Sequence, residues 1–162
     1  MNHSEDIRLY SVVPQPFAEV RSTVQHRTAA TTDHPERFSL EWLREDAARL
    51  GIHMAGVDLT APVSLTTSSY TDVPGVIPAG IVHLRFRPTG YGKLAPQLDA
   101  DLEIQAIDDH ATLVSLLGQY RPPFGAAGII ADRALMHRLA TAGLQRFFSA
   151  VVRELRRVRV AG

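Results

Sequence analysis

The chain has 162 residues, which fits a single domain spanning 1–162 that can bury a core without disulfides. Hydrophobic residues make up 45% and charged residues 21%, a composition that excludes a disordered or fibrous protein. The 17 Lys and Arg residues balance 17 Asp and Glu residues, so the basic surplus of a dedicated nucleic-acid binder is missing. The absence of cysteine excludes disulfides, thiol nucleophiles and cysteine-ligated metals.

No apolar run in the sequence reaches the roughly 18 residues that a membrane helix needs. The first residues, Met1–Asp6, are polar and acidic, and no apolar stretch of a secretory signal follows them. We therefore expect a cytoplasmic protein with no integral membrane association and no nucleic-acid partner.

The N-terminal region predicts a strand and a short helix. Ile7–Val13 is apolar-rich and ends at Pro14, which is typical of a strand. Pro16 suits the first position of a helix, and the apolar residues after it are at helical spacing. The segment 28–32 is small and polar, which predicts a loop.

A second helix is predicted over 35–50. Asp33 can cap it, and Pro35 and Glu36 suit its first turn. Its apolar face includes Trp42, and Gly51 stands where a helix commonly ends.

From residue 55 to 120 the texture changes to short segments rich in Val, Ile, Leu, Thr and aromatic residues, separated by Gly, Pro and Asp. This texture is typical of an antiparallel sheet. The predicted strands are 56–60, 63–71, 80–88, 98–107 and 111–120.

Two of these strands show strict alternation. In 98–106 apolar residues alternate with Asp, Glu and Gln, and in 80–88 apolar residues alternate with His and Arg. Each strand therefore has one buried and one wet face. A hairpin through 89–97 in which residue 87 faces residue 99 gives three complementary pairs: Arg87–Asp99, Arg85–Asp101 and His83–Glu103.

The segment 128–159 has the pattern of one long helix with a broad apolar face and an Arg-rich end. The predicted apolar face comprises Met136, Leu139, Ala140, Gly143, Phe147, Ala150 and Val151. A strand, one or two helices, a run of strands and a long last helix together predict an α+β fold, with a curved antiparallel sheet packed on that helix.

The last predicted strand and the start of the long helix resemble a known superfamily. Residues 112–123 read T-L-V-S-L-L-G-Q-Y-R-P-P and lead through Gly125 and Gly128 to Asp132 and the pair His137-Arg138. This is similar to the end of uncharacterised bacterial members of the SRPBCC superfamily, where the strand reads T-x-L-x-L-x-G-x-Y-x-P-P. Val114 stands where that pattern has Leu. The resemblance covers roughly 60–160, including the stretch Leu94–Ile104, and extends over 1–60 only by the order of elements.

The resemblance implies the helix-grip fold of START-like, polyketide-cyclase-like and pollen-allergen-like proteins. In that fold a sheet of about six or seven strands wraps around the long C-terminal helix, with one or two short helices after the first strand. Members typically enclose an apolar cavity between sheet and helix. The resemblance implies binding of a small hydrophobic or amphipathic ligand, lipid-like or polyketide-like. The seven histidines are scattered without the spacing of a helical metal pair, so we expect no metal. We also expect no cofactor. The expected ligand-binding residues are Leu84, Phe86, Leu102, Val114, Leu116, Tyr120, Met136, Ala140, Gly143 and Phe147.

Two alternatives stay open beside ligand binding. The first is a cyclase- or hydratase-like enzyme that uses the same cavity, in which His137 and Tyr120 are the only ionisable groups we would name. No catalytic set is recognisable, so no catalytic residue is assigned. The second is a ligand-free interaction module, for which we expect a filled core and an exposed apolar patch. A homodimer is compatible with each of the three.

Several polar features have simpler structural explanations. Asp99, Asp101 and Glu103 form a wet carboxylate ladder, which is better explained as surface charge than as a calcium site. Asp132 suits the first turn of the long helix. Gly143 lies on the apolar face of that helix, where it allows either close packing or space for a ligand.

Overall fold

The computed structural model describes residues 5–33, 37–38, 63–88, 97–121 and 133–157, and within these ranges it has the predicted order of elements. The elements are β1 (Glu5–Val13), α1 (Phe17–Asp33), β2 (Arg37–Phe38), β3 (Val63–Thr67), β4 (Thr71–Val73), β5 (Ala79–Pro88), β6 (Gln97–Ala106), β7 (Thr112–Arg121) and α3 (Arg133–Arg157).

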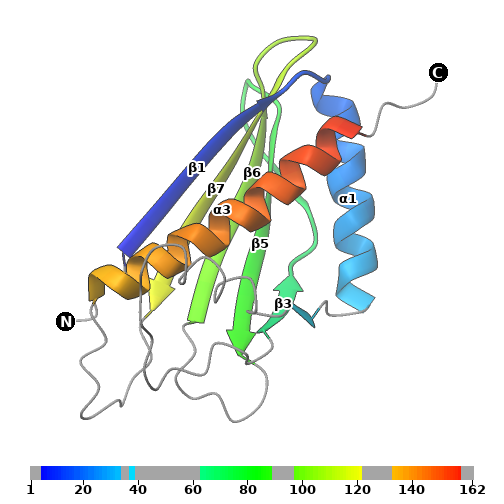
Figure 1. Cartoon of the computed structure of the whole chain (residues 1–162). Coiled ribbons are helices and arrows are strands. Elements are labelled where there is room, and N and C mark those ends of the chain that lie inside the picture. The colour runs from blue at the N-terminus through cyan, green and yellow to red at the C-terminus, as the bar shows by residue number, and fades with distance from the viewer. Residues whose placement is uncertain (1–4, 34–36, 39–62, 89–96, 122–132, 158–162) are drawn as a thin grey trace, which may run out of the picture.

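The strands form one antiparallel sheet of seven strands in the order β1-β7-β6-β5-β3-β2, and β4 pairs with β5 beside this path. The N-terminal strand β1 pairs with the last strand β7 along its whole length, from Glu5 opposite Tyr120 to Val13 opposite Thr112. The long helix α3 crosses one face of this sheet, and α1 runs along its side near β3 (Figure 1). This arrangement is a helix-grip fold, as the sequence predicted.

Alternation along β6 and β7 separates an inner face from an outer face. Ala100, Leu102 and Ile104 of β6 are buried, whereas Asp101 and Glu103 between them are partly exposed to solvent. On β7, Val114 and Leu116 are fully buried. The inner face meets the helices, so the predicted division into a buried and a wet face is confirmed for β6.

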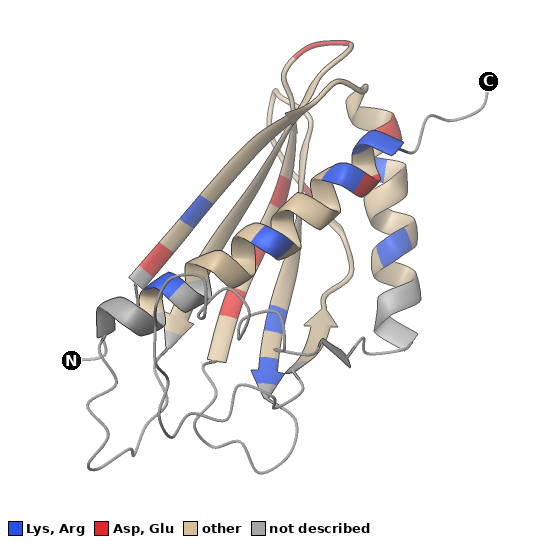
Figure 2. Cartoon of the chain, viewed as in Figure 1, with Lys and Arg blue, Asp and Glu red and all other residues tan. Residues whose placement is uncertain are grey.

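The predicted register between β5 and β6 is wrong by two residues. Arg85 lies opposite Asp99, and His83 lies opposite Asp101. The charged residues repeat every second position in both strands, so a shift of two residues still sets opposite charges on adjacent strands, as Figure 2 shows. Charge complementarity therefore does not distinguish these two registers. Arg87 still reaches Asp99 diagonally, with 2.8 Å between Nη2 and Oδ1.

The buried face of α3 also differs from the predicted one, because it lies one residue further along the chain. The fully buried side chains are Leu144, Phe148, Val152 and Leu155, which follow one another at helical spacing. Phe147 and Val151 pack beside them partly buried, and Ala150 is exposed. Apolar residues cover so wide an arc of this helix that the sequence alone allows several rotations.

Four predictions for the first half of the chain need correction or fall outside the described residues. The segment 28–32 belongs to α1, because the helix continues to Asp33 and the Thr28 hydroxyl donates to the Val24 carbonyl. Residues 37–38 form β2 and pair with β3, so a helix over 35–50 is wrong there. The rest of that helix, including Trp42, and the strand 56–60 lie outside the described residues. The predicted strand 63–71 is divided into β3 and the start of β4.

Candidate functional site

A hollow of about 240 Å³ lies between α1, α3 and the inner face of β3 and β6. Its walls come from elements that are far apart in the sequence. The lining residues are Thr23, Val24, Arg27, Thr28, Leu65, Thr67, Leu102, Phe147, Ala150, Val151, Glu154 and Leu155.

Most of this lining is apolar. Leu65 and Leu102 supply the sheet floor, and both are almost completely buried. The Phe147 ring forms part of the α3 wall and stands edge-on to Phe86, with 5.3 Å between the ring centroids. Such a contact fixes the direction of an aromatic side chain, so the wall has a defined shape.

One residue of the lining, Thr67, carries a buried polar atom. The Thr67 hydroxyl oxygen is inaccessible to solvent and has no hydrogen-bond partner among the described residues. Thr67 lies opposite Leu84, which places its side chain on the inner face of the sheet. A buried hydroxyl without a partner costs stability.

An ion pair bridges the two helices at the rim. Arg27 of α1 pairs with Glu154 of α3, and their side chains are 61% and 41% exposed. These two residues are the only ionisable side chains among the described residues of the lining. The hollow is therefore apolar inside and charge-balanced at its opening.

The ten expected ligand-binding residues are divided between the hollow and the interior of the sheet. Of the ten expected ligand-binding residues, Leu102 and Phe147 line the hollow. Five others, Leu84, Phe86, Val114, Leu116 and Tyr120, are buried on the inner face of the sheet. Gly143 is half-buried on α3, and the side chains of Met136 and Ala140 lie outside the description.

The α1 wall was missed. Val20, Val24 and Thr28 follow at intervals of four residues, and all three are buried. This spacing continues the helical pattern through the segment for which a loop was predicted. Extending the pattern to Thr28 would have placed α1 beside the sheet.

His137 and Tyr120, the groups named for catalysis, do not line the hollow. His137 is half-buried in α3, and its backbone carbonyl accepts a hydrogen bond from the Thr141 hydroxyl. Tyr120 is buried near the C-terminal end of β7. The structure therefore does not bring the two candidate groups together at this site.

A polar cluster fastens α1 to the β4–β5 hairpin. Arg21 donates two hydrogen bonds to the Asp72 carboxylate, and the Tyr70 hydroxyl donates a third at 3.0 Å. The Arg21 guanidinium, followed by the Tyr70 hydroxyl, lowers the pKa of Asp72 below its ordinary value. Burial, and then the Asp72 carboxylate, raises the pKa of Tyr70. Gly80 leaves room for the Tyr70 ring, because a Cβ there would overlap its hydroxyl.

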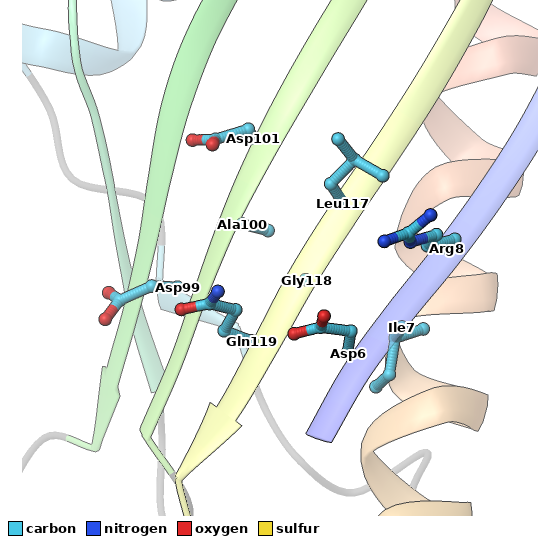
Figure 3. Close-up of a pocket in the computed structure, with 9 residues that line it drawn as sticks. All are labelled: Asp6, Ile7, Arg8, Asp99, Ala100, Asp101, Leu117, Gly118 and Gln119. Atoms are coloured by element: carbon cyan, nitrogen blue, oxygen red, sulfur yellow. The ribbon is translucent and has the colours of Figure 1, made fainter. Parts of the chain in front are cut away.

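A second depression, of about 280 Å³, lies on the outer face over β1, β7 and β6 (Figure 3). Figure 3 shows the Asp99 and Asp101 carboxylates directed away from β7, toward β5. There Asp99 pairs with Arg87 and Arg85, and Asp101 contacts His83. These two carboxylates are engaged with β5, and Asp6, Arg8 and Gln119 supply the other polar side chains of the depression.

Exposed apolar side chains gather toward one end of the sheet. Val12 and Val73 stand at the two ends of a cross-strand row that also contains Leu113, Gln105 and Ala79. The other large exposed apolar residues in the described ranges are Tyr10, Val76, Ile77 and Ile107. This is the kind of patch expected for the interaction-module alternative.

No three His, Asp or Glu side chains of the described residues are placed to hold a metal ion. Neither of the helices that the structure describes is long and apolar enough to cross a membrane.

Several solved structures are similar to this chain in fold. An aromatase/cyclase, Zhui, from Streptomyces sp. R1128 aligns with a TM-score of 0.53 and 15% identity, over 99% of both chains. A conserved protein from Geobacillus kaustophilus has a TM-score of 0.52 and 8% identity over 93% of this chain and 95% of that one. A truncated norcoclaurine synthase from Thalictrum flavum has a TM-score of 0.50 and 8% identity over 98% and 96%.

These likenesses confirm the helix-grip fold that the resemblance to the SRPBCC superfamily predicted. No protein-family model and no curated protein matches the sequence.

Proposed function

We propose that the chain binds a small apolar or amphipathic molecule, lipid-like or polyketide-like, in the hollow between α1, α3 and the sheet. The observation that carries this proposal is a hollow of about 240 Å³ that is lined mostly by apolar side chains. Ligand sites are generally concave and apolar, with a few polar groups that orient the ligand. The hollow has these properties within the described residues.

Binding is favoured over catalysis by the ionisable groups of the lining. The described lining has no His, Asp, Lys or Tyr, and its Arg27 and Glu154 are paired with each other at the exposed rim. A general acid or base needs a proton-accepting group within hydrogen-bond reach of the ligand. The fold is shared with a protein named as an aromatase/cyclase, so an enzyme that uses the same hollow is the alternative function.

The test uses 1-octanol as a defined amphipathic probe and a variant that fills the hollow. Val151 is half-buried on the α3 wall, so Val151→Phe would occupy part of the space. Ser149→Phe is the matched control, because it adds the same ring at an exposed position of the same helix. Uptake is measured by titration calorimetry and by methyl-region NMR.

We expect the wild type and Ser149→Phe to take up 1-octanol with equal affinity, and Val151→Phe to lose it. Uptake by none of the three proteins, or equal uptake by all of them, would remove the hollow as the binding site. Native mass spectrometry of protein purified gently from its own cells, followed by organic extraction, then identifies the natural ligand class.

A further inference from the structure

We propose that a second copy of this chain pairs with the free edge of β1, so that the two sheets continue into each other as an antiparallel dimer. The dimer is independent of the hollow and of the function proposed for it. It follows from three features of β1: its unpaired edge, the contact of Arg156 at one end of that edge, and the opposite charges of Asp6 and Arg8.

β1 is the last strand on its side of the sheet, and Figure 1 shows it in dark blue at this border. It pairs with β7 along all nine of its residues without a bulge, and no other described strand pairs with it. It has no Pro and no Lys, which often protect a sheet edge. A regular edge of this kind can accept a further strand.

The ladders across the sheet show which backbone groups lie at this edge. The Ala106 N–H donates to the Pro78 carbonyl, on the β5 side of β6, at 2.9 Å. Ala106 lies opposite Thr112, and Thr112 lies opposite Val13. Because backbone groups alternate between the two sides of a strand, Val13 bonds to β7, and its neighbour Val12 directs its N–H and C=O groups away from β7.

A contact from α3 agrees with this assignment and covers one end of the edge. Arg156 donates from Nη2 to the Val12 carbonyl at 3.0 Å. By the same alternation, Asp6, Arg8 and Tyr10 direct their backbone groups to the free side as well. Arg156 therefore leaves the stretch 6–10 open to a partner strand.

Asp6 and Arg8 select how two copies pair. Both side chains are exposed on the outer face of β1 (Figure 3), and neither has an ion-pair partner among the described residues. A two-fold axis that sets Asp6 opposite Arg8 of the second copy also sets Arg8 opposite Asp6 of that copy. Each facing pair then exchanges two backbone hydrogen bonds and joins opposite charges.

Neighbouring registers are less favourable. A shift of the second copy by two residues sets Arg8 opposite Arg8 or Asp6 opposite Asp6, and like charges that face each other are destabilising. A larger shift brings Val12 into the pairing, where Arg156 lies. Exposed ion pairs contribute little affinity, so they select the register of a weak dimer that forms as the protein concentration rises.

The test measures the monomer–dimer equilibrium of the full chain by sedimentation velocity at increasing protein concentration. Asp6→Arg makes both edge charges positive, and Arg8→Asp makes both negative. Each variant should repel its own copies, whereas an equimolar mixture of the two should form a heterodimer in which every facing pair is opposite in charge. The double variant Asp6→Arg/Arg8→Asp should associate with itself again. Asp109→Arg, in the exposed turn between β6 and β7, is the control for a charge reversal away from the stretch 6–10.

We expect the wild type and Asp109→Arg to dimerise with the same dissociation constant, and each single edge variant to raise that constant at least about tenfold. The mixture and the double variant should recover dimerisation. An increase of NaCl from about 0.05 M to about 0.5 M should weaken the wild-type dimer, because salt screens exposed charges. Circular dichroism verifies that each variant is folded.

Three outcomes would overturn the proposal. A wild type that stays monomeric at every concentration has no self-pairing edge. A dimer that persists in both single variants assembles through another surface. A dimer that Asp6→Arg retains and Arg8→Asp loses, or a mixture of the two folded variants that stays monomeric, excludes the pairing of Asp6 with Arg8.

Discussion

The inner face of the sheet is filled on one side and hollow on the other. On the β1–β7 side, the Leu144 side chain of α3 lies directly over Gly118, where an added Cβ would come within 2.5 Å of it. On the α1–β3 side, the same helix lies over Leu65 and Leu102, and a space of about 240 Å³ remains. Gly118 lets α3 approach the sheet closely on the filled side. On the other side, the larger side chains of Leu65 and Leu102 form the floor of the hollow.

The two sides therefore differ in what stabilises them. The filled side depends on packing between buried apolar side chains, with Leu144 1% exposed and Ile7 4% exposed. The hollow side is held at its margin by polar contacts between elements, the ion pair Arg27–Glu154 and the bonds of Arg21 to Asp72. Mutations on the two sides should have different consequences for stability.

The largest effect is expected from Leu144→Ala. This change removes a fully buried side chain and leaves a cavity, which should lower the free energy of unfolding by about 2–5 kcal/mol. Val151→Ala on the hollow side is the matched comparison, and its loss should be about 1 kcal/mol because the side chain is only half-buried beside existing space. Urea denaturation of both variants measures the difference, and equal losses would contradict the contrast between the two sides.

Gly118→Ala tests the close approach directly. The new Cβ would overlap the Cδ1 atom of Leu144, and such overpacking typically costs about 1–3 kcal/mol. The cost should fall when Leu144 is shortened, so the double variant Gly118→Ala/Leu144→Ala should show a coupling free energy in a double-mutant cycle. Additive losses in urea denaturation would mean that the two residues do not restrain each other.

The sequence predicted the elements of the sheet and the long helix because their periodicities are strong. Alternation along β6 and the acid–base ladder with β5 identified both strands and their wet faces. The register was missed by two residues because the charges of Asp99 and Asp101 repeat at the same interval as the alternation. A pattern with period two distinguishes the faces of a strand and leaves even shifts of register unresolved.

The hollow could not be predicted with the same success. Its position depends on how α3 is rotated over the sheet and on how far α1 extends, and neither follows from one segment alone. The buried side of α3 could contain either Gly143 and Phe147 or Leu144 and Phe148, so the sequence allows two rotations of the helix. The contact of Leu144 with Gly118 selects the second rotation. The small polar residues after Thr28 concealed the end of α1. The middle of this helix, from Thr23 to Thr28, forms a wall of the hollow.

A smaller effect, of opposite sign, is expected from Thr67→Val on the hollow side. Valine has nearly the shape of threonine, and it replaces a buried hydroxyl that has no described hydrogen-bond partner. Removal of such a group should raise the free energy of unfolding of the unliganded protein by about 1 kcal/mol. Thermal denaturation without ligand measures this gain. A loss of stability would contradict this account, because it would mean that the hydroxyl is hydrogen-bonded in the folded protein.

The smallest effect concerns the polar cluster that holds α1 against the β4–β5 hairpin. The paired Arg21 guanidinium lowers the pKa of Asp72 in the folded protein, so the folded state binds a proton there less readily than the unfolded chain does. The stabilisation by this carboxylate is therefore complete above the unfolded pKa, near 3.8, and is lost as the pH falls through the lower folded value. The difference in melting temperature between the wild type and Asp72→Asn should stay constant from pH 7 to pH 5 and shrink toward pH 3. Asp108→Asn, in the exposed turn between β6 and β7, is the control for a general effect of charge, and the same pH dependence in both variants would show that the contact of α1 with the hairpin makes no contribution of its own.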